Sequence, residues 1–141
     1  MSEAHLRKTA ELTLLDRVFK EMKATKRITS KHKTQLSASF GKRLENALQA
    51  LEEKRVKRYV FKPSQKVIWI VVGKERDYQI IPSAEFCTCD DFYFRVMDRE
   101  VHLCYHLIAQ KLAEVLGEYD TIEEYDDLYE TLMREWRAPE L

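Results

Sequence analysis

The sequence predicts an α+β fold in which helical segments precede and follow a small antiparallel sheet. Apolar residues recur at three- and four-residue steps near both ends of the chain, as in amphipathic helices. Between these regions lie three β-rich segments separated by turn residues. All three cysteines fall into one short pattern after the last of these segments, which predicts a metal-binding hairpin followed by a helix.

The length of 141 residues is near the commonest domain size, so we expect one domain over residues 1–141. Its predicted parts are a helical region at 1–54, a core with the cysteine pattern at 56–117 and a C-terminal helix at 121–137. No apolar run is long enough to span a membrane, and the N-terminus lacks the apolar core of a secretory signal. We therefore expect an intracellular protein, whose clustered cysteines are more typical of metal ligands than of disulfides.

Two amphipathic helices are predicted in the N-terminal part. The apolar stripe Leu12, Leu15, Val18, Phe19 and Met22 indicates a helix over about residues 3–25. A second stripe indicates a helix from a Ser30 cap to about Lys54, although Gly41 lies inside it; its members are Leu36, Phe40, Leu44, Leu48 and Leu51. The first stripe can pack on the core or contact a partner.

Three strands are predicted to form an antiparallel meander. They are VKRYVF from Val56, the apolar run Val67 to Val72, and Tyr78 to Ile81 after a turn at Gly73. The middle strand is apolar on both faces, so we expect it to be central and covered on one side by the N-terminal helices.

Two further helices follow. Apolar residues from Cys104 to Leu116 have helical spacing and stop at Gly117, a typical C-cap. A last helix is predicted from Thr121 to Trp136; its stripe is Ile122, Tyr125, Leu128, Tyr129, Leu132 and Trp136.

The cysteine pattern is C-x-C, fourteen residues from Asp90 to Leu103, then C-x-H. Zinc takes four tetrahedral ligands, commonly thiolate and imidazole, and this pattern supplies four: Cys87, Cys89, Cys104 and His106. Alternate residues of a strand point to one face, so the first two can converge on one ion while the last two come from the opening turn of the next helix. Four protein ligands close the site, whereas a catalytic zinc needs an open position.

Alternative interpretations of this region remain. The three thiols can be buried free cysteines beside an incidental histidine. His102 can be a spare ligand, a donor to a ligand or a surface residue. Asp90 and Asp91 can act as acid and base groups, but no nucleophile accompanies them, and residues of this kind more often turn the chain.

Cys87-Thr-Cys89 and Cys104-Tyr-His106-Leu-Ile-Ala109 resemble the SWIM zinc finger, whose signature is CxC followed by CxHxxA. The likeness extends over about residues 30–135, through FGKRLENALQALEE, VIWIVVG and CTCDDFYFRV, to the small SWIM subunit of Shu-type recombination-mediator complexes. It implies one structural Zn²⁺ held by the four residues above, with Ala109 as the motif alanine. Tyr105 and Asp90 depart from the basic residue and the proline that family members often carry at these positions.

The resemblance also implies a partner and a process. In this family the SWIM subunit pairs with a RecA/Rad51-like (RadA) paralog and supports recombinase action on single-stranded or branched DNA. The chain itself has no GxxxxGK[ST] loop, so ATP chemistry would belong to the partner. Together with the high charged share of 34%, the likeness indicates an archaeal member, hence cytoplasmic, or nuclear if eukaryotic.

The net charge of zero conceals a strong polarity. Residues 1–66 carry 17 Lys and Arg against 7 Asp and Glu, a net +10, and residues 67–141 carry a net −10. The basic half can bind nucleic acid or an acidic partner, or the two halves can attract each other within the fold. The candidate phosphate contacts are Lys31, Lys33, Lys42, Arg43, Lys54, Arg55, Lys57 and Arg58.

Four functions are therefore considered. The first is a zinc-stabilised recombination accessory subunit that is not an enzyme and has no membrane or small-molecule partner. The second is a DNA-binding SWIM regulator that uses the basic N-terminal half. The third is an enzyme acting through Asp90, Asp91 or His102, and the fourth a protein-interaction module in another process.

Overall fold

The structure is a computed structural model that describes residues 3–74, 76–84, 86–89 and 103–137. These residues form five α-helices and five strands. The helices are α1 (Glu3–Thr25), α2 (Ser30–Phe40), α3 (Lys42–Glu52), α4 (Tyr105–Leu116) and α5 (Tyr129–Arg137). The strands are β1 (Val56–Lys62), β2 (Lys66–Val72), β3 (Asp77–Ile81), β4 (Phe86–Cys87) and β5 (Asp120–Tyr125), with 3-10 turns η1 (Pro82–Ala84) and η3 (Asp126–Leu128). No helix among these residues is both long and apolar enough to cross a membrane.

The α+β class is confirmed, but the sheet has five strands and is mixed. Its order is β4-β3-β2-β1-β5, so β2 is central as the apolar run predicts. Strands β1 to β4 pair antiparallel in sequence order, whereas β5 lies parallel to β1 at the opposite edge. The three-stranded antiparallel sheet expected from the sequence is thus extended on both sides.

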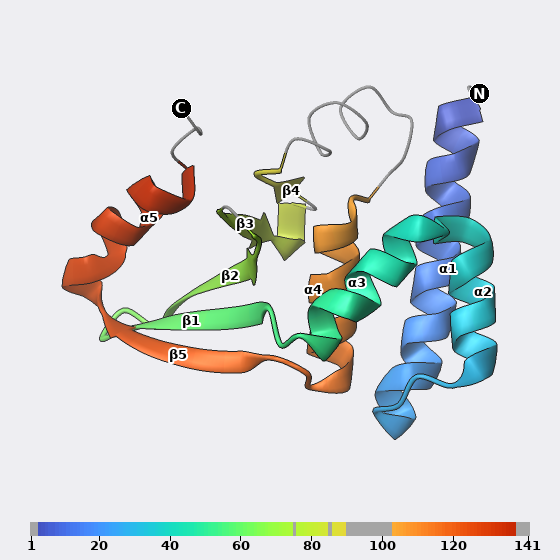
Figure 1. The fold of residues 1–141 in the computed structure, drawn as a ribbon, viewed down its shortest axis with the longest axis horizontal. Coiled ribbons are helices and arrows are strands. Elements are labelled where there is room, and N and C mark those ends of the chain that lie inside the picture. Colours follow the sequence, from blue (N-terminus) through green and yellow to red (C-terminus); the bar gives the residue numbers. More distant parts are fainter. Residues whose placement is uncertain (1–2, 75, 85, 90–102, 138–141) are drawn as a thin grey trace.

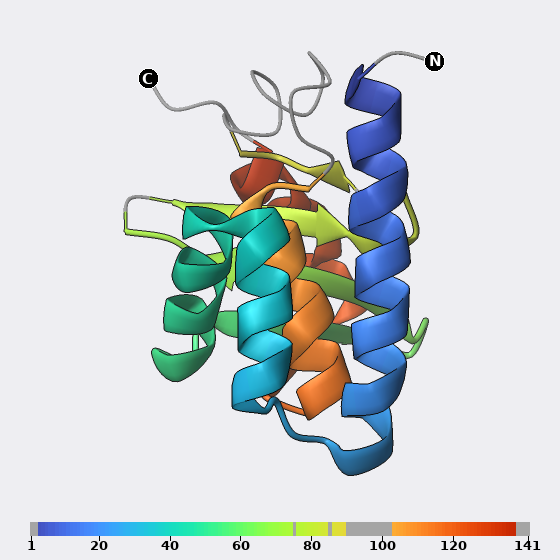
Figure 2. The ribbon, with the colours of Figure 1, turned by 90° about the vertical axis from the view of Figure 1, so that its right-hand side faces the viewer.

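Helices cover both faces of this sheet (Figure 1). Alternation along β2 directs Trp69 and Val71 into the larger core with α4, and Ile70 into a smaller core with Trp136 of α5. The N-terminal helices do not lie directly on the sheet as expected; α1 and α3 pack against α4, which separates them from the strands (Figure 2). Helix α4 is accordingly buried along most of its length.

The single helix predicted from residue 30 to 54 is wrong, because the chain breaks at Gly41. This residue has φ 53° and ψ −124°, a conformation that residues with a Cβ rarely adopt, and it separates α2 from α3. The cap of α2 is Thr29 rather than Ser30. The backbone N–H of His32 donates to Thr29 Oγ1, and the Thr29 N–H donates to His32 Nδ1, both at 3.2 Å.

The helix predicted from Thr121 to Trp136 is wrong in its first half. Residues Asp120–Tyr125 form β5, and the helix begins only at Tyr129. Strand β5 is acidic and pairs with the basic β1, where Lys57 contacts Asp120 at 2.6 Å and Lys62 contacts Glu123 at 3.1 Å. The parallel ladder and these charge pairs favour a strand over the helix that the apolar spacing suggested.

Candidate metal centre

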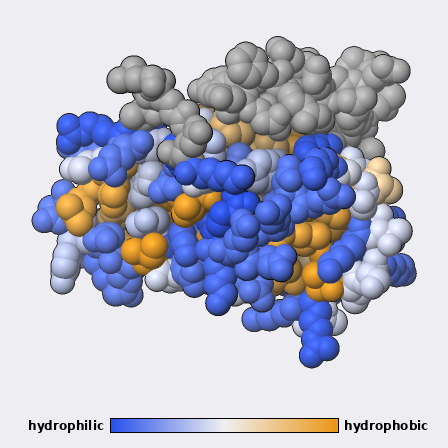
Figure 3. All heavy atoms as spheres, viewed as in Figure 1, coloured by the Kyte–Doolittle hydropathy of each residue, from blue (hydrophilic) through white to orange (hydrophobic). Residues whose placement is uncertain are grey.

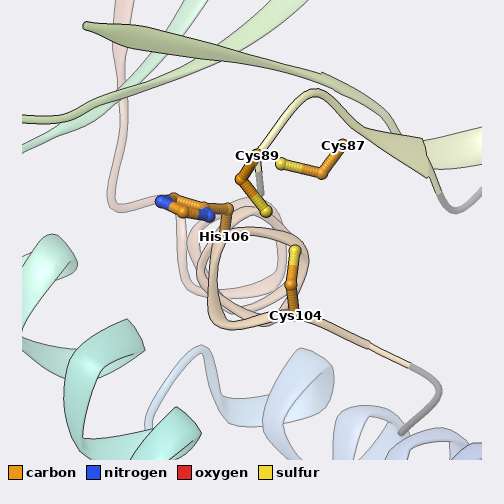
Figure 4. Close-up of side chains that lie close together, drawn as sticks. All are labelled: Cys87, Cys89, Cys104 and His106. Atoms are coloured by element: carbon orange, nitrogen blue, oxygen red, sulfur yellow. The ribbon is translucent and has the colours of Figure 1, made fainter. Parts of the chain in front are cut away.

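Four side chains that could hold a metal ion meet where β4 approaches the start of α4. They are Cys87, Cys89, Cys104 and His106, and their ligand atoms all lie within 4.8 Å of one another. All four side chains are buried, and the cysteines form no disulfide. Figure 4 shows the three sulfur atoms pointing toward one another, with the imidazole beside Cys89. The structure thus brings together the whole ligand set that the spacing predicts.

The C-x-C segment is positioned by β3. Cys87 pairs with Ile80 in the antiparallel ladder. Thr88, between the two cysteines, receives a hydrogen bond on Oγ1 from the Gln79 N–H at 3.0 Å, and its own N–H donates to the Gln79 carbonyl at 3.2 Å. Because two hydrogen bonds tie Thr88 to the backbone of Gln79, the two thiols flank a fixed backbone segment.

The C-x-H segment is positioned by the N-terminus of α4. Cys104 is the N-cap residue with extended backbone angles, φ −78° and ψ 166°, and its carbonyl accepts the Ile108 N–H at 3.2 Å. His106 lies in the first turn, and Ala109 follows three residues later, fully buried in the larger core. A small side chain at this position allows close packing beside the ligands, as the motif alanine implies.

The geometry fits a tetrahedral metal ion with sulfur and nitrogen ligands. Sulfurs about 2.3 Å from a tetrahedral zinc are about 3.8 Å apart, and the four ligand atoms here lie no more than 4.8 Å from one another. Both ring nitrogens of His106 are buried, and neither has a hydrogen-bond partner among the described residues. Buried polar atoms are nearly always satisfied, so a nitrogen of this kind facing three thiols is typical of a metal ligand.

The electrostatics of the three thiols also favour a cation. Burial raises the pKa of Cys87 far above its ordinary value, and hydrogen bonds to Cys104 and Cys89 raise it further. Hydrogen bonds from Cys104 and Cys87 lower the pKa of Cys89, so these two thiols together stabilise one thiolate. Three thiolates gathered in one buried cluster repel one another, and a bound divalent cation offsets that repulsion.

Two tyrosine rings complete the environment of the histidine. The ring centroid of Tyr105 lies 3.8 Å from that of His106, and the centroid of Tyr78 lies 4.3 Å from it. No role is predicted for Tyr78 from the sequence, although strand alternation places Tyr78 on the same face as Ile80, which pairs with Cys87. That alternation was the available signal for its position.

The structure separates the eight basic residues predicted as phosphate contacts into two groups. Four contact the rest of the fold: Arg43 binds the Leu103 carbonyl, Arg55 pairs with Glu53, Lys57 pairs with Asp120 and Arg58 lies over the Tyr119 ring. Lys31, Lys33, Lys42 and Lys54 are exposed. The eight come from three elements and the segment between α3 and β1, from the start of α2 to the interior of β1. Asp90, Asp91 and His102 lie outside the described residues.

Comparison with known proteins supports the assignment of the cysteine pattern. No protein-family model and no solved structure matches the chain. An uncharacterized protein of Archaeoglobus fulgidus is 36% identical over 99 residues, which cover 70% of this chain and 78% of that protein. The zinc finger SWIM domain-containing protein 7 homolog of Dictyostelium discoideum is 25% identical over 125 residues, which cover 87% of this chain and 80% of that protein. The chain therefore belongs to the same family as the archaeal protein and is a distant homologue of a SWIM zinc finger protein.

Proposed function

We propose that the protein is a zinc-stabilised accessory subunit in homologous recombination and DNA repair, that it is not an enzyme, and that it partners a RecA-like paralog. The observation that carries the zinc assignment is the buried Cys87, Cys89, Cys104 and His106 cluster with its unpartnered imidazole. The name of the Dictyostelium relative supports a SWIM-type finger. The recombination role is supported by the resemblance of residues 30–135 to the SWIM subunit of Shu-type complexes.

One zinc ion would be structural in this site. Three thiolates and one imidazole fill a tetrahedral coordination sphere and leave no position for substrate or activated water. The ligands come from two segments, the C-x-C after β3 and the start of α4, so the ion would connect the sheet to the central helix. Structural zinc in small fingers contributes about 10–16 kcal/mol of apparent binding free energy, which is coupled to folding.

Metal analysis tests the zinc assignment. Purified wild-type protein should contain one zinc per chain, and Cys104→Ser should lose the metal together with cooperative thermal unfolding. Tyr105→Phe is the matched control, because this residue lies between two ligands but offers no ligand atom to the cluster. It should retain zinc. A wild-type protein that folds stably without metal would contradict the assignment of a structural zinc finger.

Co-purification tests the recombination role separately. Tagged wild-type protein expressed in its source cells should bring down a RecA-like ATPase, and Cys104→Ser should not. If zinc is bound but no RecA-like protein is recovered, the finger assignment stands and the recombination role fails. ATP hydrolysis is expected only in samples that contain the partner.

A further inference from the structure

The turn between α1 and α2 carries an uninterrupted group of exposed cations. Within residues 20–33 the only acid is Glu21, whose Oε2 lies 2.9 Å from Nε2 of His32. Six basic side chains in this stretch are exposed, and we call them the basic tip: Lys20, Lys23, Lys26, Arg27, Lys31 and Lys33. Figure 3 shows that the lower part of the molecule below α1 and α2, where this turn projects, is strongly hydrophilic.

The basic tip differs from several cations in and beside α3 and β1, which pair with acids. Lys42, Lys57 and Lys62 pair with Glu45, Asp120 and Glu123, and Arg55 pairs with Glu53. In the part of the chain that the structure describes, none of the six tip residues forms an ion pair. The positive charge of this turn is therefore not neutralised within the fold, and it remains available to an anionic ligand.

Helical geometry places two of these cations on the outer side of α1. Val18 and Met22 are buried in the core, whereas Lys20 and Lys23 are exposed. With a rise of 1.5 Å per residue, these two residues are separated by about 4.5 Å along the axis. This step is close to the spacing of phosphates along a nucleic acid strand, about 3.4 Å in a stacked duplex and longer in an extended single strand. Lys26 and Arg27 follow the end of α1 at Thr25 and lie in the turn itself.

The backbone of the turn is held in place, so binding does not require the turn itself to become ordered. The reciprocal hydrogen bonds of Thr29 and His32 start α2, and His32 also contacts Glu21 of α1. Figure 2 shows α1 and α2 side by side, joined by a turn that projects beyond the neighbouring helices. The surface is thus convex, with positive charge on both arms of a helical hairpin.

We propose that the basic tip binds the phosphate backbone of single-stranded DNA without sequence preference. A flexible strand can follow a convex surface and contact cations on both arms, whereas a stiff duplex meets a convex tip at few phosphates. The proposal rests on the proposed function in one respect, since it places on this chain the DNA contact that recombination requires. It does not depend on the zinc ion.

Binding of the full-length protein to fluorescein-labelled oligothymidine of about 30 nucleotides, followed by anisotropy, tests this inference. Contact with three to four phosphates predicts that log K falls with log salt with a slope of about −2 to −3. Lys23→Gln, Lys26→Gln and Lys31→Gln combined should weaken binding roughly tenfold or more at low salt and make the slope shallower by about 2. A duplex of the same length should bind the wild type more weakly.

The matched control removes three cations that are paired with acids, through Lys42→Gln, Lys57→Gln and Lys62→Gln combined. It has the same net charge as the tip variant, and its binding should stay within about twofold of wild type. If both variants lose DNA affinity equally, the loss is explained by net charge alone and the proposal is overturned. A wild type that does not bind the oligonucleotide at low salt, or one displaced equally well by polyglutamate of matched charge, would also overturn it.

Zinc content and recovery of the RecA-like partner are measured on the same variants. Both should remain at wild-type levels, because all six substituted residues lie outside the metal cluster. If they do and the tip variant binds DNA as tightly as wild type, this inference fails while the proposed function stands.

Discussion

Nη1 of Arg43 donates a hydrogen bond of 2.7 Å to the carbonyl oxygen of Leu103, a residue 60 positions away in sequence. Leu103 is fully buried and immediately precedes the ligand Cys104. The guanidinium of Arg43 also lies over the Phe40 ring, 5.1 Å from its centroid. Arg43 is among the phosphate contacts predicted from the sequence, but in the structure its side chain joins the start of α3 to the segment that leads into the metal site.

Arg43→Ala should destabilise the protein and weaken its hold on metal. The Leu103 carbonyl would lose a charge-assisted hydrogen bond, which costs about 1.5–3 kcal/mol in unfolding free energy. Urea denaturation measures this loss, and competition with a chromogenic chelator measures zinc affinity. Lys42→Ala is the control, since the side chain of Lys42, next to Arg43 in the sequence, is 77% exposed and pairs with Glu45 across one helical turn. Equal effects of both substitutions would argue against a specific role of the hydrogen bond between Arg43 and the Leu103 carbonyl.

Replacement of Gln110 by Met should leave stability unchanged or raise it. Gln110 is fully buried in α4; its Nε2 donates to Glu114 at 2.9 Å, but its Oε1 has no hydrogen-bond partner among the described residues. An unsatisfied buried acceptor costs about 1–3 kcal/mol, which an apolar side chain of similar size avoids. Thermal unfolding of the variant checks this. A strong loss of stability would show that Oε1 is satisfied in solution, for example by a buried water.

Lys54→Gly should stabilise the end of α3. Lys54 is exposed, follows the C-cap Glu53 and has a φ of 56°, in the left-handed region that disfavours side chains. Glycine removes about 1 kcal/mol of this strain. Lys54→Ala separates the backbone effect from the charge, because it keeps the Cβ and should leave the melting temperature nearly unchanged. If alanine and glycine shift it equally, the effect is due to charge.

Asp77→Asn should raise stability at neutral pH. Burial, and then the charge of Glu135, raise the pKa of Asp77 above 3.8 in the folded protein. The folded state therefore binds this proton more tightly than the unfolded chain, so stability falls as pH rises from about 3.8 through the folded pKa. The variant lacks this penalty, and its urea midpoint should exceed that of wild type at neutral pH but converge with it below pH 3.8. A constant difference at all pH values would contradict the assignment.

The candidate metal site was predictable because its information is local. Cys87 and Cys89 are separated by one residue, as are Cys104 and His106, and each pair comes from one short backbone segment. The ligand chemistry then implies that the two segments meet. The residues that hold these segments were not predictable, because Gln79 acts through its backbone and Arg43 reaches Leu103 only after α3 has packed beside α4.

The helices near residues 3–25 and 104–116, the central apolar strand and the ligand set were determined by the sequence, since each depends on periodicity or spacing within a short segment. Only the tertiary structure decided that Asp120–Tyr125 forms a strand. The spacing of Ile122 and Tyr125 also suits a helix, but in the fold this segment lies beside β1 and pairs with it. The tertiary structure also decided which cations remain free. Lys57 and Lys62 meet acids only because β5 pairs with β1, whereas no described acid pairs with the cations of the α1–α2 turn. Charge and periodicity are properties of a segment, but strand pairing and charge neutralisation depend on which segments become neighbours when the chain folds.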